Sequence, residues 1–267
     1  MLNKEIPIEK FKKLKMLVLD SDGVTAKRGT RIIEKETKDY LEVSVKANKL
    51  SDSLASKINK LKKKLIICVT SGRGLIWLQS MYSKIIDDKT IIIAENGNIA
   101  LIKGKLKQLF DYDAEYFTLR AKLKNEISKL PINGFEPKQI ILTANCPYRM
   151  EEIPRLIKKI DKKKQIKALW VAGEAWDIQR KNVSKGAGIK KIVKLLGLKM
   201  ENTIIIGDGP NDKEMVEMAG VGVSADINDL KADYYTVGKG LGGEILVDYL
   251  LKNYEFLSGH CWFAKCW

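Results

Sequence analysis

The sequence predicts an α/β protein with a parallel-sheet core and an inserted α+β unit. Short apolar runs of strand length alternate with segments whose apolar residues recur at helical spacing, which is typical of parallel strands joined by helices. Several of these runs end in acidic, hydroxyl or glycine residues. The carboxyl ends of parallel strands form the ligand crevice of such a sheet. The middle of the chain departs from this alternation and therefore indicates a second unit.

The composition fits a soluble globular protein. The chain has 267 residues, 45% of them hydrophobic, which suffices for one large domain or two modest ones. Its four cysteines are too few and too scattered for a disulfide framework. Residues 1–15 lack the apolar core of a signal peptide, and no apolar run approaches the roughly 18 residues that span a bilayer. We therefore expect a cytoplasmic protein with no membrane partner.

The net charge of +15, from 48 basic and 33 acidic residues, invites a nucleic-acid partner. However, the lysines are spread along nearly every predicted helix, as in residues 60–64 and 158–164, and are not interleaved with aromatic residues. This distribution favours a solvated lysine-rich surface. We expect no nucleic-acid partner, and we expect the surface to attract anionic substrates.

The first acidic motif follows the apolar run Met16–Leu19, which is predicted to be a buried parallel strand. Asp20 and Asp22 lie one residue apart at its end, and two such carboxylates repel each other unless a cation lies between them. Mg²⁺ suits this arrangement, since it binds one or two carboxylates together with substrate phosphate. A calcium loop is excluded because its twelfth residue would be Arg31 instead of Glu. An ordinary turn stays open on this motif alone.

The pattern then predicts a hairpin, two helices and two buried strands before the middle of the chain. In order these are the hairpin over 31–45, a helix over 51–61, a strand over 65–69, a helix over 75–81 and a strand over 90–94.

A second motif, Thr70-Ser71-Gly72-Arg73, lies between a predicted strand and a predicted helix. Hydroxyl groups and a glycine at such a junction, where free helix N–H groups point, form an anion site. A simple helix cap explains the same residues. Both interpretations remain open at this point.

The middle of the chain predicts a separate α+β unit. From residue 99 to 179 the pattern gives two strands, a helix over 114–130, a strand over 139–144, a helix over 151–161, and strands over 167–171 and 175–179. We therefore divide the chain into a core of residues 1–97 and 182–257, an inserted cap of residues 98–181, and a tail of residues 258–267.

After the insert the chain returns to the core at Lys185. A helix with apolar residues at 189–196 precedes a buried strand over 203–206, and this strand ends in the acidic loop Gly207–Asp212. Two short strands, over 221–223 and 232–236, and a helix over 244–252 complete the core. Asp208 and Asp212 thus lie, like Asp20, at the carboxyl end of a predicted strand.

Four motifs in this order resemble the haloacid dehalogenase superfamily of phosphatases. They are Asp-x-Asp-Gly-Val at 20–24, Thr-Ser-Gly-Arg at 70–73, Lys185, and Gly-Asp-Gly-Pro-Asn-Asp at 207–212. The resemblance covers residues 15–251 and implies a Rossmann-like core. The insert resembles the large α/β cap of the Cof-type branch. The segment 232–236 with its later glycine pair resembles archaeal phosphoglycolate phosphatases.

Two departures concern the substrate. Val24 replaces the commoner threonine, and the hairpin over 31–45 is longer than usual, resembling the Kdo-phosphate phosphatases. Both leave the chemistry unchanged.

The resemblance implies a Mg²⁺-dependent phosphatase that acts on a small phosphorylated metabolite, a sugar phosphate or a phosphoglycolate-like ester. Asp20 would be the nucleophile and Asp22 the general acid and base. The implied metal ligands are Asp20, the Asp22 carbonyl, Asp208 and Asp212, and the implied phosphate ligands are Thr70, the Ser71 amide, Lys185 and Asn211. A sugar phosphomutase of the same superfamily stays open. A basic nucleic-acid-binding protein on an inactive scaffold is a further alternative.

The four motifs contact only phosphate and metal, so selectivity is expected in the insert. Arg149 and Arg180 are its candidate specificity residues, with exposed surface arginines as the alternative. In the tail, His260, Cys261 and Cys266 form an incomplete zinc set. A docked or disordered extension is the other interpretation of this segment. Its histidine is the only one in the chain, so the chemistry does not depend on histidine.

Overall fold

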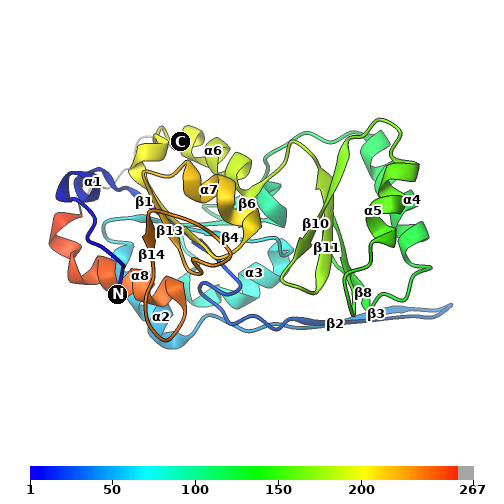
Figure 1. The fold of residues 1–267 in the computed structure, drawn as a ribbon, viewed down its shortest axis with the longest axis horizontal. Coiled ribbons are helices and arrows are strands. Elements are labelled where there is room, and N and C mark those ends of the chain that lie inside the picture. The colour runs from blue at the N-terminus through cyan, green and yellow to red at the C-terminus, as the bar shows by residue number, and fades with distance from the viewer. Residues whose placement is uncertain (258–267) are drawn as a thin grey trace.

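The computed structural model of the protein describes residues 1–257, and the tail with its incomplete zinc set lies outside this range. Figure 1 shows a large sheet with helices on both faces and, beside it, a smaller unit of strands and helices. Among the described residues, no helix is long and apolar enough to cross a membrane.

The large sheet has the strand order β14-β13-β12-β1-β4-β5-β6-β7. Neighbouring strands pair in parallel from β14 to β5. Beyond β5, β6 pairs antiparallel with β5, and β7 pairs antiparallel with β6. The strands are β1 Met16–Asp20, β4 Ile66–Thr70, β5 Thr90–Ala94, β6 Ile99–Ile102, β7 Lys105–Gln108, β12 Thr203–Gly207, β13 Val221–Ser224 and β14 Tyr234–Tyr235. The predicted α/β class with a mostly parallel sheet is therefore confirmed.

Helices bury both faces of this sheet, which is why its central strands are apolar throughout. Leu17 and Leu19 of β1 pack in one apolar cluster with α2, α3 and α8, while Met16 and Val18 pack in another with α6 and α7. These helices are α2 Asp52–Leu61, α3 Leu75–Met81, α6 Lys185–Leu195, α7 Lys213–Glu217 and α8 Gly242–Lys252, and α1 Ile8–Lys13 precedes the sheet.

One boundary differs from the sequence prediction. Residues 99–108 were assigned to the insert, whereas β6 and β7 extend the large sheet beyond β5. The chain reverses at Asn96 and Gly97, whose φ angles of 55° and 99° are left-handed, and β6 then pairs antiparallel with β5. A strand pattern alone does not show which sheet a strand joins, so the boundary was placed too early.

The smaller unit, here called the cap, has an antiparallel sheet of order β10-β11-β9-β8. Its elements are β8 Gly134–Glu136, β9 Leu142–Asn145, β10 Ile166–Val171, β11 Ala175–Arg180, α4 Ala114–Ile127 and α5 Glu152–Ile160. Trp176 and Ile178 share an apolar cluster with α4 and α5. Figure 1 shows these helices on the side of the cap sheet that faces away from the large sheet. The opposite face of the cap sheet therefore looks toward the core.

The predicted hairpin is present as β2 Arg31–Glu36 and β3 Leu41–Lys46. Figure 1 shows it reaching from the core along the cap. The Glu34 carboxylate accepts a hydrogen bond from the Phe135 amide at 2.5 Å, and the Glu34 amide donates to the Asn133 carbonyl at 3.4 Å. Gly134 lies between these contacts, where an added Cβ would approach the Glu34 Cβ to 2.5 Å. The hairpin therefore forms a second connection between core and cap.

Short 3₁₀ turns complete the described fold. They are η1 Ser83–Ile85, η2 Glu95–Gly97, η3 Met200–Asn202, η4 Pro210–Asp212 and η5 Tyr254–Phe256. Two of them, η2 and η4, directly follow strands of the large sheet, so they lie at its carboxyl edge.

Candidate active site

The site residues predicted from the four motifs meet at the carboxyl edge of the large sheet. Asp20 ends β1, Thr70 ends the neighbouring β4, and the two residues are paired in register. Asp208 follows β12, the neighbour of β1 on the other side. A cavity of about 470 Å³ opens here, between these strand ends and the cap sheet.

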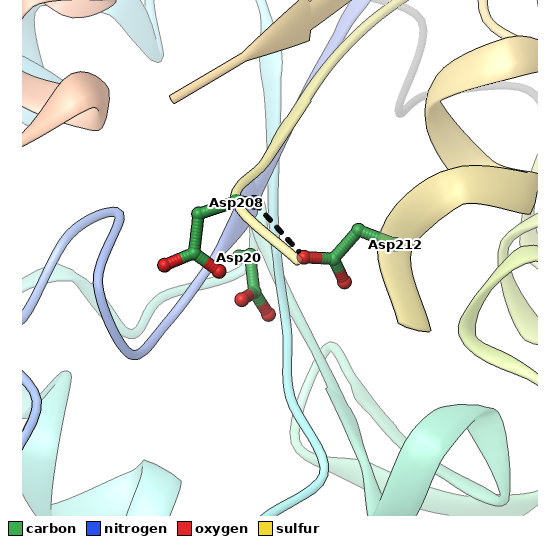
Figure 2. Close-up of side chains that lie close together, drawn as sticks. All are labelled: Asp20, Asp208 and Asp212. Atoms are coloured by element: carbon green, nitrogen blue, oxygen red, sulfur yellow. Dashed lines mark hydrogen bonds between the residues drawn. The ribbon is translucent and has the colours of Figure 1, made fainter. Parts of the chain in front are cut away.

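Three buried carboxylates form the centre of the site. Asp20, Asp208 and Asp212 offer ligand oxygens that lie within 4.8 Å of one another, and Figure 2 shows Asp20 and Asp208 side by side with Asp212 beside them. One Asp212 oxygen accepts the Asp208 amide at 3.0 Å and the Gly209 amide at 3.2 Å, which fixes its direction. An all-oxygen set of this kind fits a hard divalent cation such as Mg²⁺.

The electrostatics of this cluster favour positive charge beside it. Burial, together with the nearby Asp212 carboxylate, raises the pKa of Asp20 well above its ordinary value. Burial also raises the pKa of Asp208, although its bond to Arg28 opposes this. Ionised carboxylates at this spacing therefore depend on positive charge to stay ionised.

Lys185 supplies one such charge from within the protein. Its Nζ donates to Asp20 Oδ1 at 2.5 Å and to Asp212 Oδ1 at 2.8 Å. Burial alone would lower the pKa of Lys185, but the two carboxylates raise it strongly, so the ammonium stays charged. Lys185 is the first residue of α6. Ser184 caps this helix by accepting a hydrogen bond from the Ala187 amide.

Asp22 is held by Arg73, the last residue of the second sequence motif. Arg73 Nε and Nη2 each lie 2.7 Å from a different oxygen of Asp22, and Nη2 also contacts the Thr30 hydroxyl. Both charged side chains line the cavity. Arg73 belongs to the second sequence motif, but its spacing there does not predict the contact with Asp22.

The structure narrows the two interpretations of Thr70 and Ser71. Helix α3 begins with Gly74 as its N-cap and has no side-chain cap bond, so neither hydroxyl caps it. The Thr70 hydroxyl is buried and has no hydrogen-bond partner among residues 1–257. Buried polar groups are normally paired, so this oxygen is available to a ligand.

One predicted contact of Ser71 needs correction. Its amide was expected to bind phosphate, but it donates to the Ile93 carbonyl at 3.0 Å, because the pairing of β4 with β5 continues past the end of β4. The Ser71 side chain lines the cavity, and its oxygen accepts the Arg73 amide at 3.2 Å. The hydroxyl is therefore the group of Ser71 that is placed to donate to a ligand.

Two further residues complete the core side of the cavity. Asn211 lines it from η4, as the motif predicts. Arg28, which the sequence analysis missed, donates to Asp208 Oδ2 at 2.7 Å from a side chain that is 46% exposed. Arg28 lies in the loop that follows Asp22, but its distance along the chain from the first motif does not predict a contact with Asp208.

The cap contributes a buried ionic cluster that the sequence analysis also missed. Lys138 Nζ lies 3.0 Å from Glu136, 3.4 Å from Asp177 and 2.6 Å from the Thr143 hydroxyl, and all four residues line the cavity. Burial would lower the pKa of Lys138, but Asp177 and Glu136 raise it above its ordinary value. These residues come from three separate segments, so no local pattern links them.

The predicted specificity arginines lie elsewhere. Arg149 is exposed and bonds to Glu151 at 2.7 Å, while Arg180 bonds to Asp113 and to the Asp111 carbonyl, both at 3.1 Å. Neither arginine lines the cavity. Contact with a leaving group would require other side-chain positions, so their role in specificity stays a prediction.

The chain is similar to known hydrolases and phosphatases. Residues 109–226 match the model of the haloacid dehalogenase-like hydrolases. Phosphoglycolate phosphatase 1 of Saccharolobus solfataricus is 30% identical over 204 residues, which cover 72% of this chain and 82% of that protein. The phosphoglycolate phosphatase of Methanosarcina acetivorans is 25% identical over 253 residues, covering 90% and 98% of the two chains.

A solved structure supports the fold. A phosphatase of the same enzyme superfamily from Bacteroides thetaiotaomicron superposes with a TM-score of 0.64 at 17% identity, covering 95% of this chain and 99% of that one. The fold and the acidic site at the strand ends define a capped α/β protein with a cluster of aspartates as its site. The chain belongs to the haloacid dehalogenase-like hydrolases, as its motifs predict, and is a phosphoric monoester hydrolase.

Proposed function

We propose that this enzyme is a Mg²⁺-dependent phosphatase that hydrolyses a small phosphate monoester through an aspartyl-phosphate on Asp20. The candidate esters are a sugar phosphate or a phosphoglycolate-like compound. The observation that carries the proposal is the position of Asp20, at a strand end, in contact with Lys185 and beside Asp208 and Asp212. A carboxylate held against positive charge at the wall of a cavity is suited to attack an anionic phosphate.

The metal would be held by the carboxylates of Asp20 and Asp208 and by the backbone carbonyl of Asp22, with Asp212 as a ligand or as support for the others. When bound, Mg²⁺ supplies positive charge that offsets the repulsion between the carboxylates and the phosphate.

In the first step, an oxygen of Asp20 attacks phosphorus while the bond from phosphorus to the ester oxygen breaks. The leaving oxygen takes a proton from Asp22, so a neutral alcohol departs. Covalent catalysis replaces one difficult displacement by two easier ones. Lys185, bonded to Asp20, stabilises negative charge as the transition state forms.

In the second step, water attacks phosphorus of the aspartyl-phosphate and gives a proton to Asp22. The bond from phosphorus to the Asp20 oxygen breaks, which releases inorganic phosphate and restores both carboxyl groups. The hydroxyls of Thr70 and Ser71, with Asn211 and Lys185, would hold the phosphate oxygens throughout. The unpaired buried hydroxyl of Thr70 supports this assignment.

The names of the two archaeal relatives support a phosphoglycolate-like ester, whereas the volume of the cavity leaves room for a larger alcohol. A phosphomutase would use the same core residues and would return the phosphoryl group to the sugar. Product analysis separates the two functions, because a hydrolase releases free phosphate and a mutase yields an isomeric sugar phosphate.

The test is Asp20→Asn, assayed for phosphate release from p-nitrophenyl phosphate and from a panel of sugar phosphates and phosphoglycolate with Mg²⁺. We expect kcat to fall by at least about a thousandfold, since an amide is a poor nucleophile. Asp229→Asn makes the same chemical change at an exposed position of the cavity wall and should retain activity. Full activity of Asp20→Asn in a clean preparation would refute the mechanism.

A further inference from the structure

The cap side of the cavity carries one acidic side chain that belongs neither to the proposed mechanism nor to the Lys138 cluster. Glu174 follows the tight turn at Ala172 and Gly173, which joins β10 to β11 and has left-handed φ angles of 53° and 72°. The Glu174 amide donates to the Val171 carbonyl at 3.1 Å, and its carbonyl accepts the Cys146 amide at 2.8 Å. The backbone of Glu174 is therefore fixed, with its side chain on the cavity wall.

The Glu174 carboxylate makes no hydrogen bond or ion pair with residues 1–257. Its side chain is only partly exposed, and burial raises its pKa, an effect that the charge of Arg73 opposes. A partly buried carboxylate without a partner has acceptor capacity that the protein leaves unused.

The basic side chains near Glu174 are already bound to other acids. Both nitrogens of Arg73 that face Asp22 are bonded to it at 2.7 Å. Lys138 is bonded within its own cluster to Glu136 and Asp177. On the core side, Lys185 and Arg28 are bonded to the metal-site carboxylates. On the described wall, a leaving group at the cap therefore meets an unpaired acid and no unpaired base.

We propose that Glu174 determines specificity by selecting phosphate esters of neutral, hydroxyl-bearing alcohols and by rejecting leaving groups that carry a carboxylate. This inference rests on the proposed function, because it concerns the ester that the same site cleaves. Of the two candidate esters it selects the sugar phosphate, against the phosphoglycolate-like compound that the names of the archaeal relatives support.

The physical reason is that an ionised carboxylate only accepts hydrogen bonds. It gains a bond from a hydroxyl of the alcohol, whereas a second carboxylate offers no donor and adds repulsion between like charges. The neighbouring Trp170 and Val171 also line the cavity and provide an apolar surface for the carbon skeleton of the alcohol. Hydroxyl selection and carboxylate rejection thus follow from one side chain.

The test compares two substrates that differ only at the relevant group. In 2-hydroxyethyl phosphate and 2-phosphoglycolate, the same two-carbon skeleton ends in a hydroxyl or a carboxylate. We expect kcat/KM of the wild-type enzyme to favour hydroxyethyl phosphate by about tenfold or more, as expected for one like-charge contact in a partly screened site. Glu174→Gln should bring the two values within about threefold of each other.

Two further variants sharpen the test. Glu151→Gln removes the same charge from an exposed position of the cap, outside the cavity, and should leave the ratio unchanged. Glu174→Lys should reverse the preference toward phosphoglycolate.

A wild-type enzyme that cleaves both substrates equally well would overturn the inference, as would a ratio that neither Glu174 variant moves. In either case, continued cleavage of p-nitrophenyl phosphate would leave the proposed function standing. Absence of phosphate release from every ester, p-nitrophenyl phosphate included, would refute the proposed function and this inference together.

Discussion

Arg73 donates two hydrogen bonds to Asp22, from Nε and Nη2 to the two carboxylate oxygens, each 2.7 Å long. Such a fork fixes the position and the plane of a carboxylate, which a single-point contact does not do. Asp22 follows the proposed nucleophile by two residues, so its orientation decides whether it reaches the leaving oxygen. Arg73 is therefore a positioning residue that holds Asp22 as a carboxylate, and one of its two bonds has to open before Asp22 carries the proton that the first step requires.

The first prediction concerns Arg73→Lys, which keeps the charge and removes the fork. We expect kcat for 2-hydroxyethyl phosphate to fall by about tenfold to a hundredfold, part of the contribution of a general acid. The value for p-nitrophenyl phosphate should fall much less, because its leaving group departs without a proton. An equal loss on both substrates would place the defect in folding or in phosphate binding instead.

The second prediction concerns the buried contacts of Lys185 with Asp20 and Asp212. Lys185→Met leaves two buried carboxylates without this partner, so the free energy of unfolding in EDTA should decrease by about 3 kcal/mol. Lys190→Met, in the same helix, breaks an exposed 3.7 Å pair with Glu214 and should cost less than about 1 kcal/mol. Urea denaturation of the three proteins measures both effects. Equal stability of the two variants would contradict the structural role of Lys185.

The third prediction concerns pH. The pKa values of Asp20 and Asp208 are raised in the folded protein, chiefly by burial, so the folded state binds more protons than the unfolded chain between the two sets of pKa values. Their contribution to stability is complete below the unfolded pKa and is lost as pH rises through the folded pKa. In EDTA, we therefore expect the free energy of unfolding to decrease across this window.

Denaturation in EDTA and in Mg²⁺, repeated from about pH 5 to pH 8, measures this dependence. Mg²⁺ binds the ionised carboxylates, so its stabilising effect should grow as pH rises. Asp208→Asn removes one titrating group and should flatten the curve in EDTA. Stability in EDTA that increases across the whole range would contradict the raised pKa values.

The core of the fold and of the site could be predicted because their signals are local. The run Met16–Leu19 and the acids after it are contiguous, and a buried strand that ends in a turn places those acids at the sheet edge. The same reasoning brought Thr70 and Asp208 to this edge, where they lie at the ends of β4 and after β12. For these residues, their position at the end of a sheet strand is enough to place them at the site.

The cap side could not be predicted in the same way. Lys138, Thr143 and Asp177 meet because β9 and β11 pair antiparallel, with Thr143 opposite Asp177 in register. Each residue alone is an ordinary polar residue on one face of a short strand. The two cap arginines were selected for their charge, but each bonds to a nearby acid outside the cavity. Pairing register between distant segments therefore decides which polar residues reach the substrate.

The last prediction concerns the contact that joins cap to core. Glu95 is fully buried after β5, and its carboxylate accepts three amides at the start of the cap segment that leads into β9. These are Gln139 and Ile140, both at 2.8 Å, and Ile141 at 3.1 Å. A carboxylate that satisfies several buried amides leaves them unpaired when it is removed, and each unpaired group carries a desolvation cost.

We expect Glu95→Ala to lower the free energy of unfolding by about 3 kcal/mol or more, since two buried amides and one partly buried amide lose their acceptor. Hydrogen exchange at residues 139–141 should also accelerate more than at the centre of β1, because the loss acts first on the position of the cap. Glu115→Ala, which removes an exposed cap carboxylate paired with Lys163, serves as the matched control and should change neither quantity appreciably. If exchange at 139–141 were unchanged while overall stability fell, Glu95 would support the core alone, and the attachment of the cap would depend on the hairpin contact of Glu34 with β8 instead.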